Sequence, residues 1–145
     1  MAASKVFPHQ NDLNSVLIIS QDLEMIRVWK MLFEQRNCYV SSETSAREGL
    51  LTSRLHSPTL IILDMDMPDK ERLTLCRELR ATTNGTILLL NSSHKAIDIL
   101  EYHRAGVDET VTESISPMAL LVKSLAWLAR QDWIVPRRPS AQIWA

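Results

Sequence analysis

Short apolar runs alternate along the chain with segments that have the periodicity of amphipathic helices. The runs have the length of strands and read SVLII, CYV, TLIIL, TILLL and VDETV, at residues 15–19, 38–40, 59–63, 86–90 and 107–111. The intervening segments at 22–36, 46–56, 72–80 and 96–106, and a last one at 118–130, place apolar residues three and four positions apart. The pattern predicts five strands and five helices in strict alternation.

Three local signals mark the ends of these helices. Ser45 precedes the second helical segment and suits an N-cap position. Gly106 follows the fourth, where glycine commonly ends a helix. Ser116 and Pro117 give the last helix an N-cap followed by a proline at its first position.

Strands that are apolar on both faces predict a parallel sheet covered by helices on both sides. Because crossovers in such sheets are right-handed, the economical topology is an α/β, doubly wound, flavodoxin-like order. We expect one domain at residues 15–130, a flexible N-terminal segment at 1–14 and a tail or linker at 131–145.

Composition narrows the classes of function. The chain has 145 residues, is 46% hydrophobic and 23% charged, and carries a net charge of -1, so a basic surface for nucleic acid is not expected. Cys38 and Cys76 have no metal-binding or CxxC spacing and are expected to be reduced, buried thiols. Without a signal-like start or an apolar run of membrane-spanning length, a cytoplasmic location is expected, with no membrane contact.

Polar side chains follow several of the predicted strands. Asp64 ends the third strand, Ser20-Gln21-Asp22 follows the first, and Asn91 and Glu113 follow the fourth and fifth. The carboxyl ends of parallel strands meet at one edge of the sheet, which is where sites form in such folds. These side chains should therefore converge.

The chain resembles a response regulator receiver domain (CheY-like). The resemblance covers about residues 15–130 and rests on LIILDMDMP at 60–68, HRAGVDE at 103–109 and SISPMALL at 114–121. It implies two-component, phosphorelay signalling, in which a histidine kinase passes a phosphoryl group to Asp64. It also implies Mg²⁺ held by carboxylates, a hydroxyl after the fourth strand and a lysine after the fifth.

The chain departs from that pattern at most of its functional positions. Ser20 and Gln21 stand where the family has an acidic pair, and Glu113 stands where it has lysine. Asn91 occupies the hydroxyl position, with Ser92 beside it. Thr110 occupies the position of the aromatic switch residue. We therefore expect a degenerate site, or pseudo-receiver, that is phosphorylated weakly or not at all.

Two interpretations of the remaining acidic residues stay open. A weakened Mg²⁺ site would use Asp64 and Asp66 together with Asp22 or Gln21. In the alternative, Asp22 is only a helix N-cap, and Asp64 and Asp66 only satisfy backbone donors of a loop.

Other functions compete with a phosphorylated receiver. LIILDMD also resembles the Asp-x-Asp motif of haloacid-dehalogenase-like phosphatases, although that motif is expected on the first strand. A second alternative is a non-enzymatic binding module, which contacts a kinase, another signalling protein or a second copy through the last helix, with Tyr102 and Trp127 on the partner surface. In that setting Trp127 either is exposed for the partner or packs under Trp133 and the tail. A third alternative is the receiver part of a longer transcriptional regulator.

Overall fold

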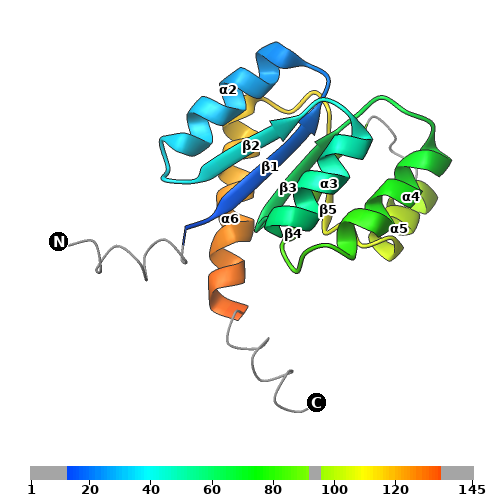
Figure 1. The fold of residues 1–145 in the computed structure, drawn as a ribbon. Helices are drawn as coiled ribbons and strands as arrows, with labels where there is room; N and C mark the ends of the chain where they lie inside the picture. Colours follow the sequence, from blue (N-terminus) through cyan, green and yellow to red (C-terminus); the bar gives the residue numbers. More distant parts are fainter. Residues whose placement is uncertain (1–12, 92–95, 135–145) are drawn as a thin grey trace.

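The computed structural model describes residues 13–91 and 96–134. In this part of the chain a parallel sheet has the order β2-β1-β3-β4-β5 (Figure 1). Its strands are β1 Ser15–Ser20, β2 Tyr39–Glu43, β3 Leu60–Asp64, β4 Thr86–Asn91 and β5 Glu109–Thr112. This order confirms the doubly wound, flavodoxin-like topology that the alternation predicts.

Helices cover both faces of the sheet (Figure 1). They are α2 Leu23–Glu34, α3 Ala46–His56, α4 Asp69–Arg80, α5 Ala96–Arg104 and α6 Pro117–Ile134. One apolar core lies between the sheet and α2 and α6, with Trp29, Phe33 and Leu128 buried in it. The other lies under α3, α4 and α5, around Leu75, Leu79 and Tyr102. Because each central strand sends alternate side chains into both cores, these strands are apolar throughout.

The predicted helix ends are present. Ser45 Oγ accepts a hydrogen bond from Glu48 N at 3.1 Å, and Ser116 Oγ accepts one from Ala119 N at 3.1 Å. Gly106 has a φ of 109°, a conformation that L side chains rarely adopt. The cap residues thus fix where α3 and α6 begin.

Two helices are longer than the pattern predicts. The α6 helix continues to Ile134, four residues past the expected domain end at Arg130. The α4 helix begins at Asp69, before the expected start at 72, because Pro68 is extended and Asp69 and Glu71 suit the positive N-terminus of a helix. The early start puts Arg72 in the first turn of α4, close to the ends of the strands.

Several sequence predictions fall on residues outside this description. Ser92 is among residues 92–95, most of the N-terminal segment is at 1–12, and the tail from 135 onward is likewise outside. Cys38 and Cys76 are buried free thiols, as expected. Within residues 13–91 and 96–134, no helix combines the length and apolar character needed to cross a membrane.

Candidate functional site

The centre of the candidate site is the contact between the ends of β1 and β3. These strands are neighbours, and their register places Ser20 opposite Asp64. Ser20 Oγ donates a hydrogen bond to Asp64 Oδ2 at 2.9 Å and accepts one from Asp22 N at 3.1 Å. The serine is fully buried. A hydroxyl therefore holds Asp64 where the family pattern has a carboxylate.

Asp22 faces the helix that follows it. It is the N-cap of α2, and its Oδ1 accepts a hydrogen bond from Met25 N at 3.0 Å. The capping interpretation of Asp22 is thus confirmed. One carboxylate oxygen of Asp22 is committed to the helix, and Gln21 beside it is exposed.

The pKa of Asp64 is raised above its ordinary value. Burial is the largest cause, and the nearby charges of Asp22 and Glu113 raise the pKa further. The hydrogen bond from Ser20 partly opposes these effects. Burial and the two neighbouring carboxylates therefore disfavour further negative charge at Asp64.

Asp64 and Glu113 line the same pocket, which has a volume of about 330 Å³. The β3–α4 loop supplies most of its wall, and α4, β4 and the residue after β5 complete it. The lining residues are Asp64, Met65, Asp66, Met67, Arg72, Leu90 and Glu113. The predicted convergence of Asp64 and Glu113 is thus confirmed. Asn91 is buried beside this region, and Thr110 on β5 is partly buried.

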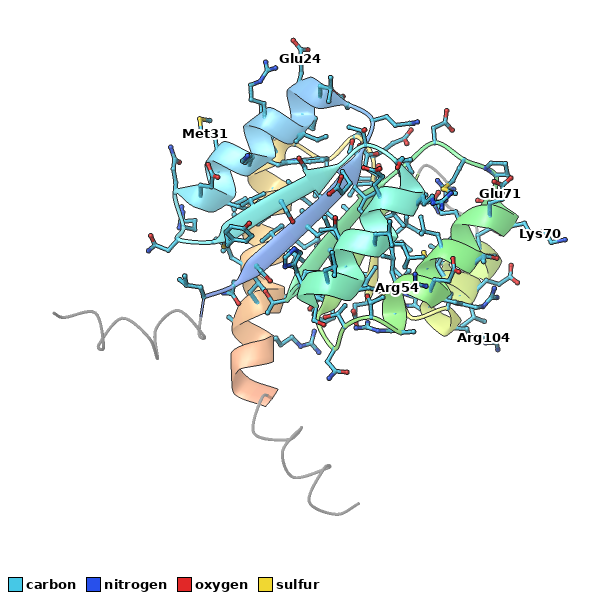
Figure 2. All side chains as sticks on the ribbon, in the orientation of Figure 1. Glu24, Met31, Arg54, Lys70, Glu71 and Arg104 are labelled. Atoms are coloured by element: carbon cyan, nitrogen blue, oxygen red, sulfur yellow. The ribbon has the colours of Figure 1, made fainter. Side chains whose placement is uncertain are left out.

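Arg72 is a member of the site that the sequence did not reveal. Its neighbours Lys70 and Glu71 project outward from α4 (Figure 2), whereas the Arg72 side chain is only 12% exposed. The guanidinium donates to Met65 O at 3.1 Å and to Asn91 Oδ1 at 3.1 Å. It also pairs with Asp69 Oδ1 at 2.8 Å. The sequence feature that could have indicated this role is a basic residue a few positions after the acidic loop at Asp64 and Asp66.

Tyr102 does not lie on a surface, and its assignment to a partner surface is wrong. The residue is 1% exposed, and its ring packs in the core under α4 and α5. Its hydroxyl accepts from Arg72 Nε at 2.9 Å and donates to Asp69 Oδ1 at 2.7 Å. Burial raises the pKa of Tyr102 to about 12. Tyr102 thus faces the core and α4 and not solvent.

Trp127 is partly buried on α6. Its Nε1 donates to Glu109 Oε1 at 2.7 Å, and the Arg130 guanidinium lies 4.5 Å from the centre of the ring. Lys123 Nζ binds the other oxygen of Glu109 at 2.8 Å. A groove of about 620 Å³ runs beside these residues, lined by Glu109, Ala119, Val122, Lys123, Ala126, Trp127 and Arg130. Trp127 is thus not simply exposed, since Glu109 on β5 anchors its polar end. The alternative that it packs under Trp133 and the tail lies outside the described side chains.

Comparison with known proteins decides the family. The sequence profile of the response regulator receiver domain matches residues 16–124. The chain belongs to the response regulator receiver family. The LDMD segment lies within the residues that the receiver profile matches.

Relatives of this receiver domain include transcriptional regulators. The probable transcriptional regulator ycf27 of Pyropia yezoensis is 25% identical over 125 residues, which are 86% of this chain and 51% of the relative. The aerobic respiration control protein ArcA of Escherichia coli strain K12 is 26% identical over 115 residues, 79% of this chain and 48% of the relative. The receiver domain thus spans about half the length of the curated relatives it matches.

A solved receiver structure has the same fold. The CheY-like response regulator receiver domain protein from Methanospirillum hungatei JF-1 superposes with a TM-score of 0.74 at 21% identity. The match covers 83% of this chain and 97% of that one. At this identity the likeness concerns the fold.

Receiver domains generally bind Mg²⁺ at the phosphorylation site, and the described residues of this chain offer fewer acidic side chains for it than the family pattern has. Among the described residues, no group of three His, Cys, Asp or Glu side chains is placed to hold a metal ion. Asp22 caps α2, Asp66 is exposed and Ser20 replaces a carboxylate. Among the acidic metal ligands of the family pattern, Asp64 keeps its place. The acidic pair at the end of β1 is replaced by Ser20 and Gln21.

Proposed function

We propose that this receiver domain accepts a phosphoryl group at Asp64 weakly or not at all, and that its output depends on protein contacts. The observation that carries the proposal is that Glu113 lines the Asp64 pocket at the position where the family has a lysine. Two like unit charges about 4 Å apart repel by about 4 kcal/mol at an effective dielectric constant of about 20. Replacing an attractive cation by a carboxylate therefore weighs against the phosphorylated state.

Arg72 lines the same pocket but does not supply the missing cation in this arrangement. A guanidinium has five N–H donors, and Arg72 uses four of them on Tyr102, Met65, Asp69 and Asn91. Its ion pair with Asp69 offsets much of its charge. The charges that act on Asp64 are those of Asp22 and Glu113, and both raise its pKa.

Weak Mg²⁺ affinity is part of the proposal. Asp64 and Asp66 are two carboxylates of one loop, and Asp22 and Gln21 contribute little while Asp22 caps α2. A divalent cation prefers six or more oxygen ligands, several of them from carboxylates. Titration with Mg²⁺ followed by amide chemical shifts should give an affinity in the millimolar range or weaker.

Mass spectrometry of the intact protein tests the acceptor directly. The domain is incubated with acetyl phosphate and Mg²⁺ and weighed, with Asp64→Ala treated in parallel. We expect no stable addition of a phosphoryl group. A phosphorylated species in the native protein that Asp64→Ala lacks would contradict the proposal.

Glu113→Lys tests whether charge is the cause. If repulsion at this position blocks phosphorylation, the variant should gain acceptor activity. Glu34→Lys, an exposed residue on α2, makes the same change in net charge away from the pocket and serves as the control. Equal activity in both variants would assign the block to the missing metal ligands.

The proposed output surface is the face formed by α5, β5 and α6. Its groove of about 620 Å³ has a largely apolar wall, and Val122 on α6 is 62% exposed. A kinase, another signalling protein or a second copy of the chain could use this face, which Trp127 borders. If the occupant is a second copy, Val122→Asp should abolish the self-association that light scattering detects in the native domain. A dimer that survives this change would place the contact elsewhere.

By resemblance to its family, we place the domain in the cytoplasm as a signalling module without enzymatic activity. A transcriptional role is proposed only through relatives such as the probable transcriptional regulator ycf27, whose name records one. Absence of turnover of an aryl phosphate, measured beside a known phosphatase, is the expected result.

A further inference from the structure

Arg72 connects four separate parts of the molecule. From the first turn of α4 its guanidinium reaches the β3–α4 loop at Met65 O, the end of β4 at Asn91 and the hydroxyl of Tyr102 on α5. Its charge lies 5.6 Å from the centre of the Tyr102 ring. We call Arg72, Asp69, Asn91 and Tyr102 the arginine hub.

The attachment of α5 depends on this hub. Among the α5 side chains that the structure describes, residues 98–104, Tyr102 is the one that is buried. Its hydroxyl is held from both sides by α4, through Arg72 Nε and Asp69 Oδ1. The contacts of Tyr102 therefore contribute to the placement of α5.

Asn91 is held in a costly arrangement. The residue is 3% exposed, and Arg72 donates to its Oδ1, which fixes the orientation of the amide. Its Nδ2 has no hydrogen-bond partner in the described part of the chain. The hydrogen bond from Arg72 therefore ties the end of β4 to the first turn of α4.

We propose that Arg72 is the positioning residue that couples the Asp64 pocket to α5. The guanidinium lines that pocket on one side and binds Tyr102 and Asn91 on the other. While it binds them, α5 is fixed without any phosphoryl group. When those contacts are lost, the cation is free to turn toward the pocket carboxylates, and α5 is released. Because coupling between two sites is reciprocal, a change in the contacts of α5 must also change the electrostatics of the Asp64 pocket.

The coupling has two measurable consequences in the unmodified protein. Tyr102→Phe keeps the ring and removes the hydroxyl that Arg72 and Asp69 bind. Amide hydrogen exchange in α5 should then accelerate about tenfold or more, the effect of losing a hydrogen bond to a charged group. Exchange in β1 and β3 should stay unchanged. Tyr39→Phe, at a tyrosine that is 62% exposed on β2, is the matched control.

The second consequence concerns Asp64. Carboxyl ¹³C shifts followed with pH should give a lower Asp64 pKa in Tyr102→Phe than in the native domain, because the guanidinium loses one of its four contacts, can lie nearer the pocket and then favours the ionised form. The double variant Arg72→Gln, Tyr102→Phe should lose this decrease, since it has no cation to release. Tyr102 acting only in packing would not move the pKa of Asp64.

Arg72→Lys is a second variant that keeps the charge but cannot span Tyr102, Met65 and Asn91 at once. It should accelerate exchange in α5 as Tyr102→Phe does, whereas Arg77→Lys, at an exposed position of the same helix, should not. Combined with Tyr102→Phe, it should add little further acceleration, because both act on one contact.

Several results would overturn the coupling. They are uniform or absent acceleration of exchange, an Asp64 pKa that Tyr102→Phe leaves unchanged, and an equal pKa decrease in the double variant. None of these measurements uses a phosphodonor. Strong phosphorylation of Asp64 would therefore contradict the proposed function without contradicting the coupling through Arg72. Unchanged exchange in α5 would contradict the coupling without contradicting the proposed function.

Discussion

Ser20 Oγ donates a 2.9 Å hydrogen bond to Asp64 Oδ2, although the two residues are 44 positions apart in the sequence. The register of β1 and β3 makes this contact, because it sets the last residues of the two strands side by side. The same hydroxyl accepts from Asp22 N and so joins the start of α2 to the candidate acceptor. One hydroxyl thus supports both the carboxylate and the helix start.

Ser20→Ala should raise the pKa of Asp64, because the mutation removes the hydrogen bond that favours the ionised form. At neutral pH the free energy of unfolding should fall by about 1.5–3 kcal/mol, since a hydrogen bond to a charged group is lost. Urea denaturation and the ¹³C shift of the Asp64 carboxyl measure the two effects. Ser41→Ala, at a partly buried serine on β2, is the control and should leave the Asp64 pKa unchanged.

Asp64→Asn should stabilise the domain at neutral pH by a few degrees in Tm. Burial chiefly raises the pKa of Asp64 in the fold, so the folded state binds its proton more tightly than the unfolded chain. The associated stability is fully present below the unfolded pKa of about 3.9 and is lost as the pH rises through the folded pKa. Asp64→Asn should therefore be more stable than the native domain at pH 7, and the two should have similar stability near pH 3. An advantage of equal size at both pH values would contradict this account.

Much of the fold could be predicted because buried strands have a simple signature. LIIL in β3 and ILLL in β4 are apolar throughout, and both strands are buried on both faces. The edge strand β2 was harder to place, because its last residues are the polar SSE and they pair with β1 alone. The convergence of Asp64 and Glu113 followed from topology, since the carboxyl ends of parallel strands share one edge.

The inward direction of Arg72 and Tyr102 could not be predicted. Both lie on helices, where the side that faces the core depends on where the helix begins. The periodicity predicts a start for α4 at residue 72, three residues after the observed start at Asp69, and so does not show that Arg72 lies in the first turn. From sequence alone, an aromatic residue such as Tyr102 on a short helix suits either a core or an interface.

Gly106→Ala should destabilise the domain by about 1–3 kcal/mol, the range for a residue forced into a sparsely populated backbone conformation. Gly106 has a φ of 109°, and an added Cβ would lie 2.5–2.7 Å from the aliphatic carbons of Arg80. Arg80 cannot move freely, because its guanidinium binds Gly106 O and Asp108. Urea denaturation measures the change.

The Arg80→Ala background separates the two causes of this loss. Without the Arg80 side chain the added methyl has room, and only the backbone strain remains. Gly106→Ala should therefore cost less in that background than in the native domain. If Gly106→Ala destabilises the native domain and the Arg80→Ala background equally, the whole loss is due to backbone strain at the positive φ of residue 106.

Glu109→Gln should destabilise the domain with the opposite dependence on pH to Asp64→Asn. Burial alone would raise the pKa of Glu109, but hydrogen bonds from Lys123 and Trp127 outweigh it and hold the pKa below its ordinary value. The stability from this carboxylate is present above the unfolded pKa of about 4.3 and is lost as the pH falls through the folded pKa. Because the pair is partly exposed, the loss at pH 7 should be only about 0.2–1 kcal/mol.

Urea denaturation at pH 7 and pH 3 tests the sign of the Glu109 effect, with Glu101→Gln at an exposed position of α5 as the control. Glu109→Gln should differ from the native domain at pH 7 and approach it at pH 3. Because the ionisation of Asp64 costs stability and that of Glu109 contributes it, the double variant should fall between the two single variants at pH 7. A Glu109→Gln domain that is as stable as the native one at pH 7 would mean that Trp127 and Lys123 hold α6 on β5 without the charge of Glu109.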